Sequence, residues 1–340
     1  TDKGSREFDP LVTAVAEAIG YSFSGPRNPR QQLLRYLHDK SLLLIVDNVE
    51  HLISEVRVLL KERVSQAPGT KILNTSRERL GLSNEWVLDI EGLPFPIEDQ
   101  ETPTPLRLSS SKAWAELDDL KTQYHAVALF ESLGKKLSPE FGLSSNGGST
   151  RKGNCPVRAV RRISQLVQGL PLGIELAASW TRTMNCSEIA EEIEKNLDFL
   201  SSTMQDMAPR HRSLRAVFES SWNLLNEKEK QGLKRLSVFH GPFDRPAAAA
   251  ITGATTPTIG ALVDRSLLKR VDSPAPPARG GYMLLDVLRQ FAAEHLADDD
   301  AEARQVQQEH AAYYLHFLAL QQDSLIGSEQ RAAVSAISQN

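Results

Sequence analysis

An aspartate at the end of an apolar run is the residue best placed to do chemistry. Residues 41–46 read SLLLIV and are followed directly by Asp47 and Asn48. An acid that ends a buried parallel strand lies at the edge where open α/β sheets bind their ligands. Such a carboxylate could hold Mg²⁺ and its waters beside nucleotide phosphates. The alternative is that Asp47 only caps the helix that follows it.

An arginine follows a second apolar run. Residues 70–75 read TKILNT, and Ser76 and Arg77 come next. If this run is the neighbouring strand, Arg77 lies about one strand spacing, roughly 4.8 Å, from Asp47 at the same sheet edge. A guanidinium there could bind a terminal phosphate with two hydrogen bonds. The alternative is a surface arginine that pairs with Glu78 or another carboxylate.

The elements around these residues follow a strand, helix, strand order. Residues 41–46 are apolar almost throughout, which predicts a strand covered on both faces. Apolar residues three and four apart in 52–64 predict a helix, and 70–75 then predicts a parallel neighbour reached by a right-handed crossover. Residues 86–90 (WVLDI) predict a third strand.

The remainder of the chain is predicted to be mostly helical. Asn226 followed three residues later by Glu229 is the sequence pattern of a capping box at the start of a helix. Residues 267–271 and 282–285 predict two strands on either side of a long loop. Helices followed by such a hairpin are typical of a winged helix.

Five motifs occur in the order and spacing of a known family. They are LLLIVDNVEHL, ILNTSRERLGLSNEWVLDIEGLPFP, QGLPLGIELAASW, RHRSLRAVFESSWNLL and YMLLDVLRQFA. With them the chain resembles, from about Asp9 to Leu296, the STAND class of signal-transduction ATPases. More closely, it is similar to the NB-ARC-type core of large bacterial transcriptional regulators. Each motif alone is weak, but five in register are specific.

The resemblance implies a role for the two strand ends. LLLIVDN matches the Walker B strand, so Asp47 would be the catalytic acid that organises Mg²⁺ for ATP or ADP. Many relatives carry a second acid where this chain has Asn48, an amide that cannot act as a base for water. Arg77 matches the family's sensor arginine.

Two further motifs would contact the nucleotide in the family. The GLPL motif, whose proline is expected against the adenine, matches Gly169, Leu170, Pro171 and Leu172. The Met-His-Asp motif of the winged helix, which holds ADP in many relatives, reads Leu284, Leu285 and Asp286 here. Leucine offers no hydrogen bond to a phosphate. Asp286 is therefore expected to cap the helix that it precedes rather than to act directly in a switch.

The family's phosphate-binding loop does not occur in the sequence. No G-x-x-x-x-G-K-[ST] is found in the 340 residues, although that loop supplies the amides, the lysine and the hydroxyl that hold the phosphates and Mg²⁺. We therefore expect a fragment whose P-loop segment precedes Thr1. Binding of ATP, ADP and Mg²⁺ by this chain alone is expected to be weak or absent.

Composition restricts the remaining functions. The chain carries 39 Lys+Arg against 43 Asp+Glu, a net charge of -4, which disfavours nucleic-acid binding over the whole surface. No apolar run reaches the roughly 18 residues of a membrane span, so a cytoplasmic protein without membrane contact is expected. The two cysteines cannot form a zinc site by themselves and are expected to be reduced. His310 and His316 are expected to be solvated.

The sequence thus predicts an α/β parallel-sheet P-loop NTPase remnant followed by an all-α helical domain and a winged-helix domain. The expected domains are the nucleotide-binding part, a linker, the helical domain, the winged helix and the start of a TPR-like sensor, at residues 1–96, 97–111, 112–208, 209–297 and 298–340. The expected function is an ATP- or ADP-binding switch of a transcriptional regulator that could self-associate on activation.

Two alternatives stay open. The winged helix could itself bind DNA through residues 258–265. If the chain is instead a nucleotide switch, DNA binding is expected in a domain outside this chain. The chain could also be an interaction scaffold with an inactive nucleotide site. If the chain is a nucleotide switch, its main partners besides the nucleotide would be the missing P-loop segment and a missing C-terminal sensor.

Overall fold

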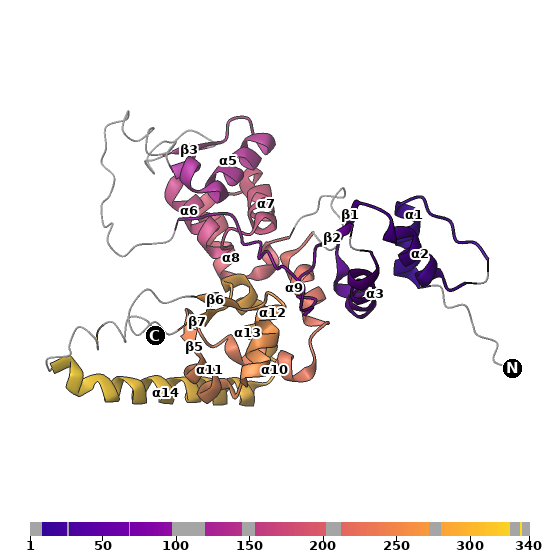
Figure 1. Cartoon of the computed structure of the whole chain (residues 1–340). Coiled ribbons are helices and arrows are strands. Elements are labelled where there is room, and N and C mark those ends of the chain that lie inside the picture. The colour runs from indigo at the N-terminus through magenta and orange to yellow at the C-terminus, as the bar shows by residue number, and fades with distance from the viewer. Residues whose placement is uncertain are drawn as a thin grey trace. The chain divides into compact units, whose positions relative to one another are not determined.

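The chain folds into two compact units. The computed structural model describes residues 9–25, 27–67, 69–96, 120–144, 154–201, 212–271, 280–326 and 334. One unit comprises Thr1–Asp89 with Asp264–Ser266, and the other comprises Ile90–Val263 with Leu267–Asn340. Each unit has its own hydrophobic core. The described residues are mostly helical, with three small sheets (Figure 1).

The first unit combines helices with a two-stranded sheet. Its elements are α1 (Pro10–Ala18), α2 (Pro29–His38), β1 (Leu42–Val46), the 3-10 helix η1 (Val49–His51), α3 (Ile53–Gln66) and β2 (Thr70–Asn74). The carboxylate of Asp9 caps α1 by accepting the backbone N–H of Leu11 and of Val12. Apolar side chains of the three α-helices form the core, and one face of the sheet packs against it.

The two strands of this sheet run parallel, as the sequence predicts. Leu42 pairs with Thr70 and Val46 with Asn74, so both strands end at the same edge. The predicted burial on both faces is wrong, because Leu43, Ile45 and Leu73 are 57%, 68% and 54% exposed. Side chains alternate between the faces of a strand, and no described residue covers this second face.

The predicted third strand is also wrong. Residues 86–90 form no strand, and Trp86 is 99% exposed, with Leu88 and Ile90 almost as open. A strand requires a hydrogen-bonded neighbour, and the sheet of this unit contains only β1 and β2 among the described residues. The apolar alternation of WVLDI therefore does not by itself indicate a strand.

The second unit begins with a helical part. Its elements are α5 (His125–Leu137), β3 (Gly142–Ser144), β4 (Asn154–Pro156), α6 (Val157–Leu166), α7 (Pro171–Ser179), η2 (Trp180–Arg182), α8 (Cys186–Lys195), η3 (Leu197–Phe199) and α9 (Leu214–Trp222). The short strands β3 and β4 are parallel. On α5, the carboxylate of Glu131 accepts Lys121 Nζ at 3.1 Å and Lys135 Nζ at 2.9 Å.

The second unit continues with helices around a small antiparallel sheet. The elements are α10 (Glu227–Leu236), β5 (Phe243–Asp244), α11 (Arg245–Thr252), α12 (Thr256–Asp264), β6 (Lys269–Val271), β7 (Gly281–Met283), α13 (Asp286–Ala297) and α14 (Asp300–Ile326). The strand order is β5-β7-β6. The two strands predicted around the long loop are confirmed as β6 and β7, and the capping box of Asn226 and Glu229 is confirmed at the start of α10.

One hydrophobic core joins the two parts of the second unit. It extends from Ala126 of α5 to Val306 of α14. Arg215 of α9 supports the junction, because its guanidinium pairs with Asp198 of η3 and, at 2.6 Å, with Glu294 of α13. Hydrogen bonds to Glu294 and then Asp198 raise the pKa of Arg215 above its already high value. The cation is thus held between three elements.

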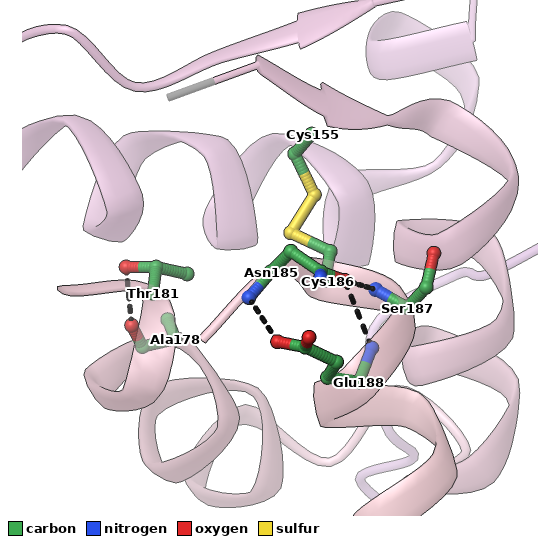
Figure 2. The surroundings of a disulfide bond; sticks show 7 residues. All are labelled: Cys155, Ala178, Thr181, Asn185, Cys186, Ser187 and Glu188. Carbon is green, nitrogen blue, oxygen red and sulfur yellow. Dashed lines mark hydrogen bonds between the residues drawn. A yellow bond between two sulfur atoms is a disulfide. The ribbon is translucent and has the colours of Figure 1, made fainter. Parts of the chain in front are cut away.

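A disulfide ties the helical part together, contrary to the expectation of two reduced cysteines. Cys155 of β4 and Cys186, the first residue of α8, are bonded with their Cα atoms 5.7 Å apart (Figure 2). Beside the bond, Asn185 and Glu188 form a capping box that fixes the start of α8. The two cysteines are 31 residues apart, and such a pairing depends on the fold rather than on local sequence.

No helix in the part of the chain that the structure describes is long and apolar enough to cross a membrane.

Candidate functional site

The strand-end aspartate lies at the carboxyl edge of the β1–β2 sheet. Asp47 follows β1 directly, is exposed, and accepts a hydrogen bond from the Thr75 hydroxyl at the end of β2. The backbone N–H of Asn48 donates to the same hydroxyl at 3.0 Å. Asn48 itself adopts a left-handed conformation with φ 59°, which asparagine tolerates better than most residues. This turn directs the chain into η1 and leaves the Asp47 carboxylate at the sheet edge.

The strand-end arginine lies at the same edge but has a different acidic partner. Arg77 Nε lies 3.5 Å from Glu50 Oε1, and the Glu50 side chain is buried to all but 5% of its surface. Glu50 Oε2 is buried and makes no hydrogen bond to any described residue. An unpaired buried carboxylate oxygen is costly, so this atom is suited to accept a bond from a bound ligand or water.

Two residues that the sequence prediction did not assign to this site, Thr75 and Glu50, contact its predicted members. Parallel pairing brings Asp47 and Arg77 to one edge, as expected. The alternative of an arginine paired with a carboxylate also holds, with Glu50 rather than Glu78 as the partner. Thr75 contacts Asp47 directly. Its place directly after β2, at the same edge as Asp47, could have identified it from the sequence as a member of the site.

The GLPL turn is a close crossing of two chain segments. Gly169 has φ +69°, and a Cβ atom there would lie 2.0 Å from the carbonyl oxygen of Leu93. The N–H of Leu93 donates to the Gly169 carbonyl at 2.8 Å. At Gly92, an added Cβ would lie 2.6 Å from the Gln168 carbonyl oxygen. Only glycine fits both positions, so the GLPL sequence fixes the path of residues 91–96 across the helical part.

The other residues of the motif lie where α7 begins. Pro171 is the first residue of α7 and is exposed, which suits a residue without an N–H in the first helical turn. Leu170 precedes the helix, and both Leu170 and Leu172 pack against the core. The turn is therefore a structural junction, and of its residues only Pro171 presents an exposed side chain that a ligand could contact.

Asp286 does not cap its helix as predicted. The N-cap residue of α13 is Leu285, which makes no side-chain capping bond, and Asp286 is the first helical residue. Its carboxylate lies 3.8 Å from Arg289 Nε one turn later. A negative charge in the first turn still favours the helix, because it faces the positive end of the helix dipole. The Leu284 side chain is buried in the core.

The candidate DNA-reading helix offers little to bind a phosphate backbone. α12 reads TPTIGALVD, and Arg265, the basic residue of the predicted stretch 258–265, directly follows it and pairs with Glu78 at 2.6 Å. Phosphate contacts by cationic side chains dominate protein–DNA affinity. Two basic residues elsewhere in the second unit are also paired with acids, Arg162 with Glu194 at 2.6 Å and Arg215 as described above.

A metal ion at the sheet edge would need ligands other than protein side chains, such as phosphate oxygens and waters. No group of three or more His, Cys, Asp or Glu side chains close enough to hold a metal occurs among the residues that the structure describes. Mg²⁺ in nucleotide sites usually binds one or two protein carboxylates together with phosphate oxygens and waters. Asp47 alone satisfies that smaller requirement.

Mycobacterial proteins that are longer than this chain are similar to it in sequence. No family model matches it. A Mycobacterium tuberculosis protein, whose name describes it provisionally as an HTH-type transcriptional regulator, is 27% identical over 314 residues. That match covers 89% of this chain and 31% of the relative, and a Mycobacterium bovis counterpart gives the same values. An uncharacterised M. tuberculosis protein is 25% identical over 299 residues, or 85% of this chain and 66% of that protein.

The chain thus spans about a third of the length of the first of these relatives. A solved structure of a STAND protein with a tetratricopeptide repeat sensor, from Pyrococcus horikoshii, is 16% identical to it. The alignment covers 92% of this chain and 35% of that one, with a TM-score of 0.26. At that TM-score no common fold follows.

Proposed function

We propose that this chain is the regulatory switch module of a bacterial signal-transduction protein that controls transcription, and that its β1–β2 edge contributes to a site for ATP or ADP with Mg²⁺. The observation that carries the proposal is the parallel pairing of β1 and β2, which brings Asp47 and Arg77 to one sheet edge. The sequence similarity over 89% of the chain to an M. tuberculosis protein named for transcriptional regulation supports the regulatory role.

The residues at the edge fit the nucleotide in part. Asp47 would hold Mg²⁺ and its waters, and the buried Glu50 Oε2 would accept a hydrogen bond from one of those waters. Arg77 would bind the terminal phosphate, the role for which a planar guanidinium is suited. The bound Mg²⁺ would supply charge neutralisation at the phosphates. The backbone cradle of a P-loop is the component that this sequence does not provide.

The second unit would read the state of the nucleotide. Its antiparallel sheet β5-β7-β6 and the neighbouring helices have the element order of a winged helix. The histidine that contacts ADP in the resembling family is replaced by Leu285. We therefore expect ADP to be held less firmly than a histidine-containing module would hold it. Asn48 favours a switch with slow or no turnover, since it cannot activate water.

The test is a titration with a fluorescent ADP or ATP analogue, with and without Mg²⁺. This chain and a version extended upstream by its own coding sequence are compared, and the extended version should bind far more tightly. In that version, Asp47→Asn should weaken binding about tenfold with Mg²⁺ and much less without it. Arg77→Ala should weaken ATP more than ADP, since only ATP has the third phosphate.

Two matched substitutions serve as controls. Asp39→Asn changes an exposed aspartate that pairs with His38, and Arg79→Ala changes an exposed arginine two residues beyond Arg77. Neither should alter nucleotide affinity. Equal affinity of the short and extended versions, or a Mg²⁺-independent effect of Asp47→Asn, would contradict the proposal and favour a scaffold without nucleotide chemistry.

A further inference from the structure

A pocket lies beside the long helix α14 and belongs to neither of the sites above. It has a volume of about 380 Å³ and lies between the segment that joins α10 to β5 and one face of α14. Volumes of this size are typical of small-molecule sites. The helix contributes His310, Tyr314, Phe317 and Leu318, which are spaced so that all four share one face. Figure 1 shows α14 in yellow alongside α10 and α11.

Aromatic rings in mutual contact form the wall of this pocket. Phe239 is buried and stacks on Phe243 with ring centroids 4.3 Å apart. The His310 ring meets Phe239 edge to face at 5.5 Å, and Tyr314 lies 4.8 Å from His310. Phe317 continues the series at 6.5 Å from Tyr314. Because each ring is held by its neighbour, the wall is preorganised to receive another flat ring.

Two polar side chains of the wall are available for a ligand. Among the described residues, none forms a hydrogen bond with the ring nitrogens of His310 or with the hydroxyl of Tyr314. His310 was expected to be solvated, but it is half-buried in the aromatic cluster. Burial, and then the neighbouring His240, lowers the pKa of His310 below its usual value. Burial and Asp244 raise the pKa of Tyr314 to about 12. Near neutral pH both groups are therefore uncharged.

The surroundings favour an uncharged ligand. No Lys or Arg lines the pocket, and the effect of Asp244 on Tyr314 indicates a negative potential at the phenol. His240 has its own partners, since Arg289 Nη1 lies 3.4 Å from its Nε2 and its Nδ1 lies 3.2 Å from the Val238 carbonyl oxygen. Arginine can only donate, so Nε2 is the acceptor in the contact with Arg289. An anionic ligand would find no free cation among the lining residues.

We propose that this pocket binds an uncharged planar aromatic molecule that carries one hydrogen-bonding group. The ring stacks within the wall formed by Phe239 and Phe317, and the polar group bonds to the Tyr314 hydroxyl. Such a ligand contacts α14 and the segment before β5 at once, so it links α14 more firmly to the rest of the second unit. The site is independent of the proposed nucleotide chemistry.

The test uses 2-naphthol, a fluorescent and uncharged aromatic alcohol, with the anion 2-naphthoate as its matched probe. Binding to the full chain is followed by fluorescence titration and calorimetry. Gly241 lines the pocket, and a Cβ atom there meets nothing within 4 Å. Gly241→Leu therefore places a side chain in open space and should lower 2-naphthol affinity at least tenfold. Gly260→Leu is the control, because Gly260 of α12 is equally open and outside the pocket.

Further outcomes separate this proposal from its competitors. Tyr314→Phe should weaken 2-naphthol about fivefold by removing one hydrogen bond, and 2-naphthoate should bind at least tenfold more weakly than 2-naphthol. If circular dichroism shows that Gly241→Leu is unfolded, Leu318→Trp fills the pocket from the other side. Equal affinity of the wild type and a folded filling variant would overturn the proposal. So would concentration-dependent dimers that either filling variant abolishes, because the occupant would then be a second copy of the chain.

Discussion

Reduction of the Cys155–Cys186 disulfide should destabilise the second unit by a predictable amount. The bond closes a loop whose ends are 31 residues apart, and the chain-entropy relation for a loop of that length gives about 3.7 kcal/mol at 25 °C. Both cysteines are buried, so reduction adds two protons without creating a cavity. The loss acts chiefly through the unfolded chain, which regains the freedom that the bond removes.

Hydrogen exchange measured by mass spectrometry can detect this loss. The most slowly exchanging amides of α6 and α8 report unfolding of the whole unit, and a loss of about 3.7 kcal/mol should accelerate them roughly 500-fold. The protein is compared as purified in air and after reduction with a phosphine. A Cys155→Ala, Cys186→Ala double variant should not respond to the reductant. Two alkylatable thiols in the air-purified protein, or unchanged exchange after full reduction, would refute the reasoning.

Three further predictions concern stability and can be checked by urea unfolding. Gly169→Ala should cost more than about 2 kcal/mol, because its Cβ would clash with a carbonyl oxygen, whereas Gly253→Ala, at a similar φ of +67° in open space, should cost only about 1 kcal/mol. Asn226→Ala should cost about 1 kcal/mol by removing the capping box of α10. Burial acts to raise the pKa of Glu131, but hydrogen bonds from two lysines outweigh it and lower that pKa. Its carboxylate therefore stabilises the fold above the pKa of the unfolded chain, and this contribution is lost as pH falls through the folded pKa. Glu131→Gln should accordingly lose less stability than the wild type between about pH 6 and about pH 3.

Local patterns in the sequence predicted the elements that local forces determine. The strands at β1 and β2, their parallel pairing and the capping box at Asn226 all follow from periodicity and helix-end chemistry. The paired strand ends then placed Asp47 and Arg77 at one edge. The candidate site was accessible from sequence because its geometry depends on a single strand, helix, strand unit.

Features that depend on distant neighbours were not predictable in the same way. Ile45 reads as a core residue, yet its burial depends on whether another element covers that face. Residues 86–90 have the pattern of a strand but no partner to pair with. Cys155 and Cys186 come together only through the packing of α6 and α8, and Glu50 reaches Arg77 only through the turn at Asn48. In each case the deciding contact is between residues that the local pattern does not connect.

The length of α14 has a mechanical consequence. A helix of 27 residues extends for about 40 Å, and α14 packs against the core of the second unit from Ala303 to Tyr314. The part beyond Tyr314 extends for about 18 Å, so a tilt of about 10° there would displace the far tip by about 3 Å. A small shift of the second unit that breaks no contact near Val306 would thus produce a larger displacement at the end of α14. A pair of spin labels could measure that displacement.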